Sequence, residues 1–267
     1  MTRFRALMVG DVMARAGRNA VRRVLPDFIS EHRIDFVVLN GENVSGGTGI
    51  TPEAARDLFA LGVDVITSGN HIWRQREIRP YIDKTPALLR PFNFAPGQPG
   101  RGVGVFETQA GYDVGVLNLQ GQIFMSFADN PFVAADEALK QLAGTRIILV
   151  DFHAEATSEK RALGFHLDGR VSAVVGTHTH VQTADAQLLE KGTGFITDLG
   201  MTGPHHSVIG MQREIIVDRF RTGLPASFKP ATEGTRFQGV TLEIDPTTGR
   251  CLSIERVDIP LADTDTP

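Results

Sequence analysis

Five short apolar runs, each ending in small residues and then in polar side chains, constrain this 267-residue chain more than any other feature. Runs of β-branched and aliphatic residues of this length predict buried strands. Because ligands of open α/β sheets bind beyond the carboxyl ends of the strands, we expect the polar side chains to meet at one edge of one sheet. The runs are Phe4 to Val9, Phe36 to Leu39, Val63 to Thr67, Arg146 to Val150 and Val171 to Val175.

The polar side chains after these runs are carboxylates, amides and imidazoles. They are Asp11, Glu42, Asn43, Asn70, His71, His153, His178 and His180. A turn aspartate or a His-x-His pair alone is an ordinary feature of turns and strands, but the whole set at strand ends predicts a metal centre. The mixture suits Mn, Fe or Zn, whereas a magnesium site would be richer in oxygen ligands.

Pairs of neighbouring metal ions form a recurring clamp for phosphoesters, in which both ions stabilise the transition state. Such a pair needs one carboxylate shared between the ions and several further ligands. Glu42 is the natural bridge, because an acid flanked by Gly41 and Asn43 after a buried strand has no evident capping role.

Helices are expected between the strands, so that the first half of the chain alternates βαβαβα. Thr51-Pro52-Glu53 is a good helix start, with Thr51 as the N-cap and Pro52 in the first turn. The expected helices are Gly17 to His32, Pro52 to Leu61, Arg74 to Ile82, Pro131 to Leu142 and Ser158 to Leu167.

The rest of the chain predicts further strands. The segment from Leu88 to Phe127 is typical of a β-meander that joins the sheet, and a turn at 245–249 predicts a hairpin near the end. Short loops and the absence of a linker predict a single domain over residues 1–262, followed by a polar tail at 263–267.

Composition restricts the function classes. The hydrophobic and charged fractions, 42% and 22%, are those of an ordinary globular protein. A net charge of -4 does not favour RNA or DNA as the main partner. The lone Cys251 supplies no thiolate ligand and fits a reducing compartment, so we expect a cytoplasmic protein. No stretch of the sequence approaches the roughly 20 apolar residues that a membrane span needs. The sequence does not decide between a monomer and a homo-oligomer.

The site residues also carry a resemblance to a known family. Gly10-Asp11, Gly41-Glu42-Asn43, Gly69-Asn70-His71, His153 and Gly176-Thr177-His178-Thr179-His180 resemble the five blocks of the calcineurin-like metallophosphoesterases. The stretches from His153 to Lys160, His178 to Asp185 and Thr197 to Pro204 are similar to the YmdB-type bacterial branch. The resemblance extends over nearly the whole chain.

The resemblance implies an α/β sandwich of central mixed β-sheets flanked by helices. It implies two Fe or Mn ions and phosphodiesterase activity on 2′,3′-cyclic nucleotides, such as 2′,3′-cyclic AMP, with a nucleoside 3′-monophosphate as product. Carried over position by position, one ion has Asp11, Glu42, Asn43 and His180 as ligands. The other has Glu42, Asn70, His153 and His178.

Two positions depart from the wider family. Its first block usually has a histidine two residues after the aspartate, where this chain has Met13. A thioether is a poor ligand for such ions, so we expect the carbonyl oxygen of Asn43 to replace it. The acid that often follows Asn-His is replaced by Ile72. We hypothesise that a metal-activated hydroxide attacks phosphorus while His71, which follows Asn70 without being a ligand, acts as the general acid.

Other readings stay open. The chain could bind a nucleotide or RNA as a metal-holding regulator with low turnover, or act as a phosphomonoesterase or nuclease. Ser68-Gly69-Asn70-His71 spells the name of a serine-hydrolase family, but the Gly-Asp-Ser motif of that family is absent. Weaker site candidates are Asp198 with the 200–206 loop, which could line the cleft, and the glycines at 46–49. Phe124, Phe127 and Phe132 are expected in the core, with base stacking as the alternative.

Overall fold

The apolar runs form strands whose side chains alternate between two buried faces. In β1 (Phe4–Val9), Phe4 and Met8 pack into one hydrophobic cluster, whereas Leu7 and Val9 pack into another, and each is at most 1% exposed. A strand that is buried on both faces needs cover on both sides. The fold therefore has at least one layer on each side of β1.

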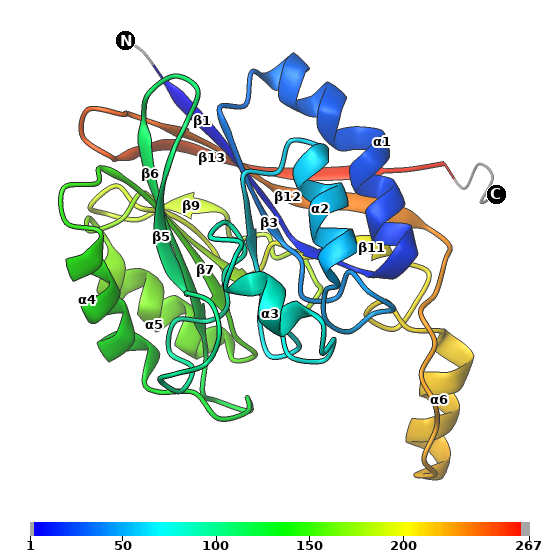
Figure 1. Ribbon diagram of the computed structural model, residues 1–267. Coiled ribbons are helices and arrows are strands. Elements are labelled where there is room, and N and C mark those ends of the chain that lie inside the picture. The colour runs from blue at the N-terminus through cyan, green and yellow to red at the C-terminus, as the bar shows by residue number, and fades with distance from the viewer. Residues whose placement is uncertain (1–2, 263–267) are drawn as a thin grey trace.

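The computed structural model describes residues 3–262, and within them the strands form two mixed sheets that pack face to face (Figure 1). The larger sheet has the order β2 (Asp11–Val12), β11 (Met201–Pro204), β12 (Thr235–Ile244), β1, β3 (Phe36–Asn40), β4 (Val65–Thr67), and β13 (Cys251–Pro260) also pairs with β12. The smaller sheet has the order β5 (Val103–Glu107), β6 (Asp113–Gln120), β7 (Ile147–His153), β8 (Ala173–Thr177), β10 (Gly194–Ile196), β9 (Gln187–Leu188).

Helices cover the two outer faces (Figure 1). Side chains from α1 (Ala14–His32), α2 (Pro52–Ala60) and α3 (Ile78–Ile82) share a cluster with Leu7 and Val9 of the larger sheet. Side chains from α4 (Pro131–Gln141) and α5 (Thr157–Leu167) share another with Ile148 and Val150 of the smaller sheet. The α/β sandwich of mixed sheets flanked by helices, expected from the resemblance, is confirmed.

The expectation of a single sheet is wrong. The parallel strands β1, β3 and β4 belong to the larger sheet, whereas β6, β7, β8 and β10 run parallel in the smaller one. The meander at 88–127 supplies an antiparallel hairpin, β5 with β6, which joins the smaller sheet. Apolar runs reveal that a strand is buried, but pairing depends on contacts between distant segments, so periodicity could not assign the strands to two sheets.

Most helix boundaries agree with the sequence to within a few residues. The Thr51 hydroxyl caps α2 by accepting a hydrogen bond from the backbone N–H of Ala54 at 3.2 Å. The helix expected from Arg74 begins only at Ile78, because turns occupy the preceding residues. The helix α6 (Arg213–Thr222), on an arm that leaves the body (Figure 1), was not expected: Ile216 is its one buried residue, so no apolar stripe marks it.

Two expectations concern the ends of the chain and membranes. Within residues 3–262 no helix combines the length and the apolar character that a membrane span requires. The polar tail at 263–267 lies outside the described residues. The single-domain organisation of residues 1–262 stays a prediction.

Candidate metal centre

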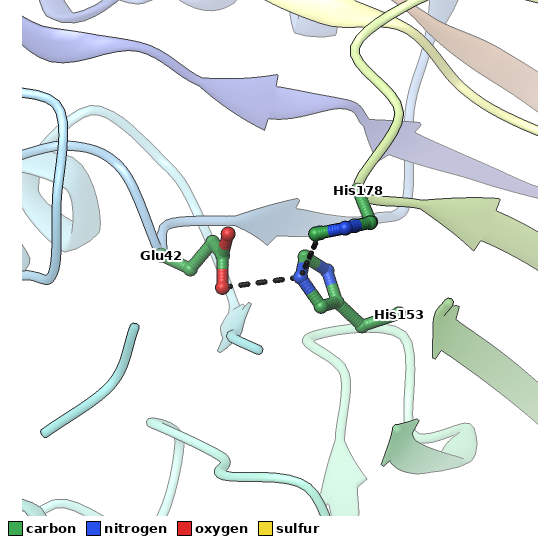
Figure 2. A group of neighbouring side chains, drawn as sticks. All are labelled: Glu42, His153 and His178. Atoms are coloured by element: carbon green, nitrogen blue, oxygen red, sulfur yellow. Dashed lines mark hydrogen bonds and ion pairs between the residues drawn. The ribbon is translucent and has the colours of Figure 1, made fainter. Parts of the chain in front are cut away.

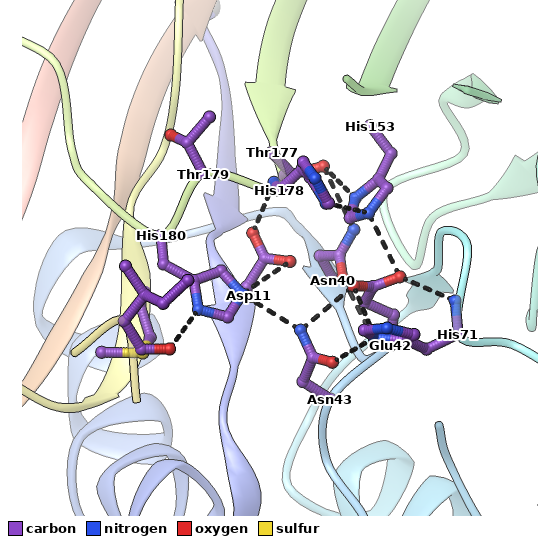
Figure 3. Close-up of polar contacts among 12 residues, drawn as sticks. Asp11, Asn40, Glu42, Asn43, His71, His153, Thr177, His178, Thr179 and His180 are labelled. Atoms are coloured by element: carbon purple, nitrogen blue, oxygen red, sulfur yellow. Dashed lines mark hydrogen bonds and ion pairs between the residues drawn. The ribbon is translucent and has the colours of Figure 1, made fainter. Parts of the chain in front are cut away.

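All eight site residues lie in one network of polar contacts where the two sheets meet. Figure 3 labels all of them except Asn70. The larger sheet and the loops after its strands supply Asp11, Glu42, Asn43, Asn70 and His71. The carboxyl ends of β7 and β8 supply His153, His178 and His180. The expected convergence is present, at a seam between two sheets, whereas the roles of these residues as ligands stay a prediction.

Glycines allow the strand ends to approach this closely. A Cβ atom on Gly69 would lie 2.2 Å from Cδ2 of His153 and 2.4 Å from Oε2 of Glu42. A Cβ atom on Gly176 would lie 1.8 Å from the carbonyl oxygen of Thr197. A larger residue at either position would push apart segments that carry the predicted ligands.

Glu42 lies at the centre of the network and is 1% exposed. Its Oε1 accepts a hydrogen bond from Nδ2 of Asn43 at 3.1 Å and lies 3.3 Å from Nδ1 of His71. Its Oε2 lies 3.2 Å from Nε2 of His153. Glu42, His153 and His178 offer ligand atoms that all lie within 4.8 Å of one another (Figure 2). The two oxygens of Glu42 thus face two different groups of side chains.

Three histidines point one ring nitrogen into the centre and use the other to fix the ring. Nε2 of His153 faces Glu42 and lies 3.0 Å from Oδ1 of Asn70, while its Nδ1 lies 2.9 Å from the Thr177 hydroxyl. The Nδ1 atom of His178 lies 3.1 Å from that Nε2 of His153, and the Nε2 atom of His178 lies 3.1 Å from a carboxylate oxygen of Glu155. Metal-binding histidines commonly have such a partner on the ring nitrogen that is not coordinated.

His180 follows the same pattern beside Asp11. Its Nδ1 lies 2.9 Å from the carbonyl oxygen of Ile209, while its Nε2 lies 3.7 Å from Oδ1 of Asp11 and 3.1 Å from Nδ2 of Asn43. Asp11 is 0% exposed, and within the described part of the chain its Oδ1 has no hydrogen-bond partner. A buried carboxylate oxygen without a partner is costly, and a cation beside it would remove that cost. The donor set therefore fits a metal ion.

The carboxylates of the site favour a positive charge on one histidine, His153. Burial alone would raise the pKa of Glu42, but the charge of His153 and hydrogen bonds from His153 and His71 hold it well below its usual value. Burial would lower the pKa of His153, yet Glu42 and then Asp11 raise it to about 9. Burial and the charge of His153 lower the pKa of His178 to about 3. A metal ion would have to displace the proton on His153, because only a neutral imidazole binds metal.

Asn43 is turned toward His71 in this structure. Its Oδ1 accepts a hydrogen bond from Nδ1 of His71 at 2.8 Å, and its Nδ2 faces Glu42 and His180. A half-turn of the amide would direct the oxygen to the Asp11 and His180 side, as a ligand role requires. Met13, at the position of the missing histidine, packs with Met201 in a small buried cluster, which agrees with its exclusion as a ligand.

A buried ion pair beneath the site was not anticipated. Nζ of Lys160 lies 2.6 Å from Oδ2 of Asp198, and their side chains are 1% and 0% exposed. The same Asp198 oxygen accepts hydrogen bonds from the backbone N–H of Thr179 at 3.1 Å and from its hydroxyl at 2.8 Å. The expectation that Asp198 lines a substrate cleft is therefore wrong. Thr179 lies between His178 and His180 in the chain. Both histidines have a strained backbone with positive φ, 100° and 65°.

The sequence contains a signal for this ion pair. Lys160 shares a helical spacing of three, four and seven residues with Leu163, Gly164 and Leu167, all of which are buried on one face of α5. A lysine on a buried face needs a counter-charge. Asp198 follows the strand at 194–196, so the pair was within reach of sequence reasoning.

Comparisons with known proteins agree with this geometry. The family model described as YmdB-like protein matches residues 7–257. A 2′,3′-cyclic-nucleotide 2′-phosphodiesterase of Bacillus subtilis (strain 168) is 47% identical over 255 residues, which cover 95% of this chain and 96% of that protein.

Two solved structures have the same fold. A hypothetical protein from Thermus thermophilus has a TM-score of 0.91 at 42% identity, over 96% of this chain and 99% of its own. A novel phosphatase from Mycoplasma pneumoniae has a TM-score of 0.92 at 34% identity, over 97% and 94%. Given the family match over most of its length and a relative at 47% identity, this chain belongs to the YmdB-like protein family.

Proposed function

We propose that this protein is a metal-dependent phosphodiesterase that hydrolyses 2′,3′-cyclic nucleotides, such as 2′,3′-cyclic AMP, to nucleoside 3′-monophosphates. The observation that carries the proposal is the buried Glu42 carboxylate, because one of its oxygens faces Asn43 and the other faces His153, which belong to the two predicted groups of ligands. The name of the Bacillus subtilis relative supports the choice of substrate.

The donor set suits two ions, with Fe or Mn the best match for mixed imidazole, carboxylate and amide ligands. Asp11, Asn43 and His180 would hold one ion, Asn70, His153 and His178 the other, and Glu42 both. When bound, such ions polarise phosphoryl oxygens and make water a nucleophile near neutral pH. The protein fixes the histidine rings through Thr177, Glu155 and the Ile209 carbonyl, so no ring has to reorient during the reaction.

His71 is placed to act as the general acid. Its Nδ1 points to Asn43 and Glu42, and the side chain is 25% exposed, which leaves Nε2 as the ring nitrogen that a substrate can reach. In the proposed reaction water gives up one proton to solvent and the resulting hydroxide oxygen bonds to phosphorus. The bond from phosphorus to the 2′ oxygen breaks, and His71 gives a proton to that oxygen. The strained five-membered ring opens, and the phosphate stays on the 3′ oxygen.

The test is turnover by anaerobically purified protein whose metals have been counted by elemental analysis. The substrates are 2′,3′-cyclic AMP, 3′,5′-cyclic AMP, a nucleoside monophosphate, a short RNA and bis(p-nitrophenyl) phosphate, with products separated by chromatography. We expect metal-dependent release of 3′-AMP from the first substrate and its loss in Glu42→Gln. Tight binding without turnover would support a regulatory protein, and hydrolysis of the monophosphate or the RNA instead would support a phosphomonoesterase or nuclease.

A separate variant tests the role of His71. His71→Asn is smaller than histidine, but its amide nitrogen can take the place of Nδ1 as a hydrogen-bond donor, and it cannot donate a proton as an acid. We expect kcat to fall on the order of 10²–10⁴-fold while the metal content stays that of the wild type. Unchanged turnover would show that another group protonates the leaving oxygen.

A further inference from the structure

Two phenylalanines in the loop after β6 are exposed, although their hydrophobicity predicts burial. In the loop at 121–130, Phe124 is 89% exposed and Phe127 is 105% exposed, as open as in an extended peptide. Ile123 beside them is 43% exposed. By contrast, Phe132 packs against the cluster under α4 and α5. The expectation of a core position thus holds for Phe132 and is wrong for the other two.

The backbone of this loop is held in place by buried polar side chains. Glu159, which is 6% exposed, accepts hydrogen bonds from the backbone N–H groups of Gln122 at 2.9 Å and Ile123 at 3.3 Å. The side chain of Gln120 donates to the carbonyl oxygen of Ser126 at 2.9 Å. Phe124 has a φ of 61°, a left-handed backbone that costs on the order of 1–3 kcal/mol and persists only where its surroundings impose it. The rings are therefore presented to solvent from a fixed support.

The loop begins at the predicted metal centre. Gln120, the last residue of β6, pairs with His153, and the backbone N–H of Gly121 donates to the carbonyl oxygen of His153 at 3.0 Å. Three residues span at most about 11 Å, so Cα of Phe124 lies within that distance of Gly121. Figure 1 shows the chain between β6 and α4 turning beyond the carboxyl end of β6.

We propose that Phe124 and Phe127 form an aromatic platform that stacks on the nucleobase while the cyclic phosphate occupies the site at Glu42 and His153. This inference rests on the proposed function, whose substrate has an apolar ring face a few ångströms from its phosphate. An uncharged ring has no attraction for phosphate but stacks on any base, so the platform selects nucleotides over other phosphodiesters. Because stacking reads no base edge, purines and pyrimidines are both accepted.

The test compares two substrates that differ only in the base. Wild type, Phe124→Ala, Phe127→Ala and the double variant are assayed with 2′,3′-cyclic AMP and with ribose 2′,3′-cyclic phosphate, which has no base. We expect kcat/KM for the nucleotide to fall roughly 5- to 150-fold in the double variant, mostly through KM. The base-free substrate should be hydrolysed equally by all four proteins. The matched control is Phe220→Ala, which removes a ring that is 81% exposed on α6. This variant should leave kcat/KM unchanged for both substrates.

Two results would contradict the proposal that Phe124 and Phe127 stack on the base. Equal losses on both substrates would show a general effect on the site, and no loss on either would show that the rings do not touch the base. Light scattering of the same variants detects the competing role: a lower molecular mass in Phe124→Ala or Phe127→Ala, with equal losses on both substrates, would assign the rings to contacts between copies of the chain. If the wild type hydrolyses neither substrate, the phosphodiesterase proposal fails, and calorimetric binding of 2′,3′-cyclic AMP against the base-free compound decides the platform separately.

Discussion

Replacing Lys160 by methionine tests how much the buried ion pair of Lys160 and Asp198 contributes to the free energy of unfolding of the protein. Met keeps the unbranched side chain and removes the charge, which leaves the Asp198 carboxylate without a cation at 0% exposure. Removing one partner of a buried ion pair costs about 3–5 kcal/mol, because the remaining charge stays desolvated. The hydrogen bonds from Thr179 and Gly200 to Asp198 persist and place the expected cost at the lower end, about 3 kcal/mol.

The assay is urea unfolding of the metal-free proteins, with the slope of each transition compared to verify that the same surface is exposed. The double variant Lys160→Met with Asp198→Asn removes both charges and should recover most of the loss, since no uncompensated charge remains. Lys140→Met is the matched control: its ion pair with Glu137 is exposed at 70% and 57%, so the change should stay within about 0.5 kcal/mol. A loss below about 1 kcal/mol in Lys160→Met, or a double variant no better than the single one, would refute the reasoning.

Three further outcomes follow from single features of the structure. Burial raises the pKa of the Cys251 thiol to about 12, so a maleimide at pH 8 should label it only as fast as the protein unfolds, and rapid labelling of native protein would contradict this. Removing the metal with a chelator should lower Tm by roughly 5–10 °C, relative to protein with the free ion at about 100 times its Kd. The reason is that the Asp11 and Glu42 carboxylates would then lack a neighbouring metal cation. An equal Tm in scanning calorimetry would argue against a structural contribution of the metal. Gly69→Ala should abolish stoichiometric metal binding in elemental analysis, because its Cβ would overlap His153. Gly115→Ala should bind metal normally, because its Cβ would lie 3.1 Å from the Leu142 side chain and 3.4 Å from Ile148, away from the site.

The sequence predicted which residues meet at the site more accurately than it predicted how the strands are divided between sheets. Asp11, Glu42 and His178 were placed together because each follows a buried parallel strand, and that local rule does not depend on which sheet the strand joins. The assignment to one sheet failed because β3 and β7 have the same apolar pattern, and only contacts between distant segments separate them. Phe124 and Phe127 were misplaced for the opposite reason: hydrophobicity predicts burial, but polar side chains under the loop hold its backbone with the rings outward.

The division of the site between two sheets has a physical consequence that a single sheet would not have. Glu42 comes from the larger sheet and His153 from the smaller one, so the distance between them depends on how the sheets pack. Directly below, the buried carboxylate of Asp151 on β7 accepts hydrogen bonds from Asn40 and Thr67 of the larger sheet and from Thr177 of the smaller one.

These hydrogen bonds connect the two sheets next to the site. Thr177, which donates to Asp151, also lies 2.9 Å from Nδ1 of His153. The hydrogen bonds of Asp151 fix the relative position of the sheets where apolar packing, which is not directional, would permit small shifts. A metal ion between Glu42 and His153 would add a second connection across the same seam. Metal affinity and the packing of the two sheets are therefore linked, and substitutions at Asp151 should weaken both together, although its carboxylate is hydrogen-bonded to Asn40, Thr67 and Thr177 and is not one of the predicted ligands.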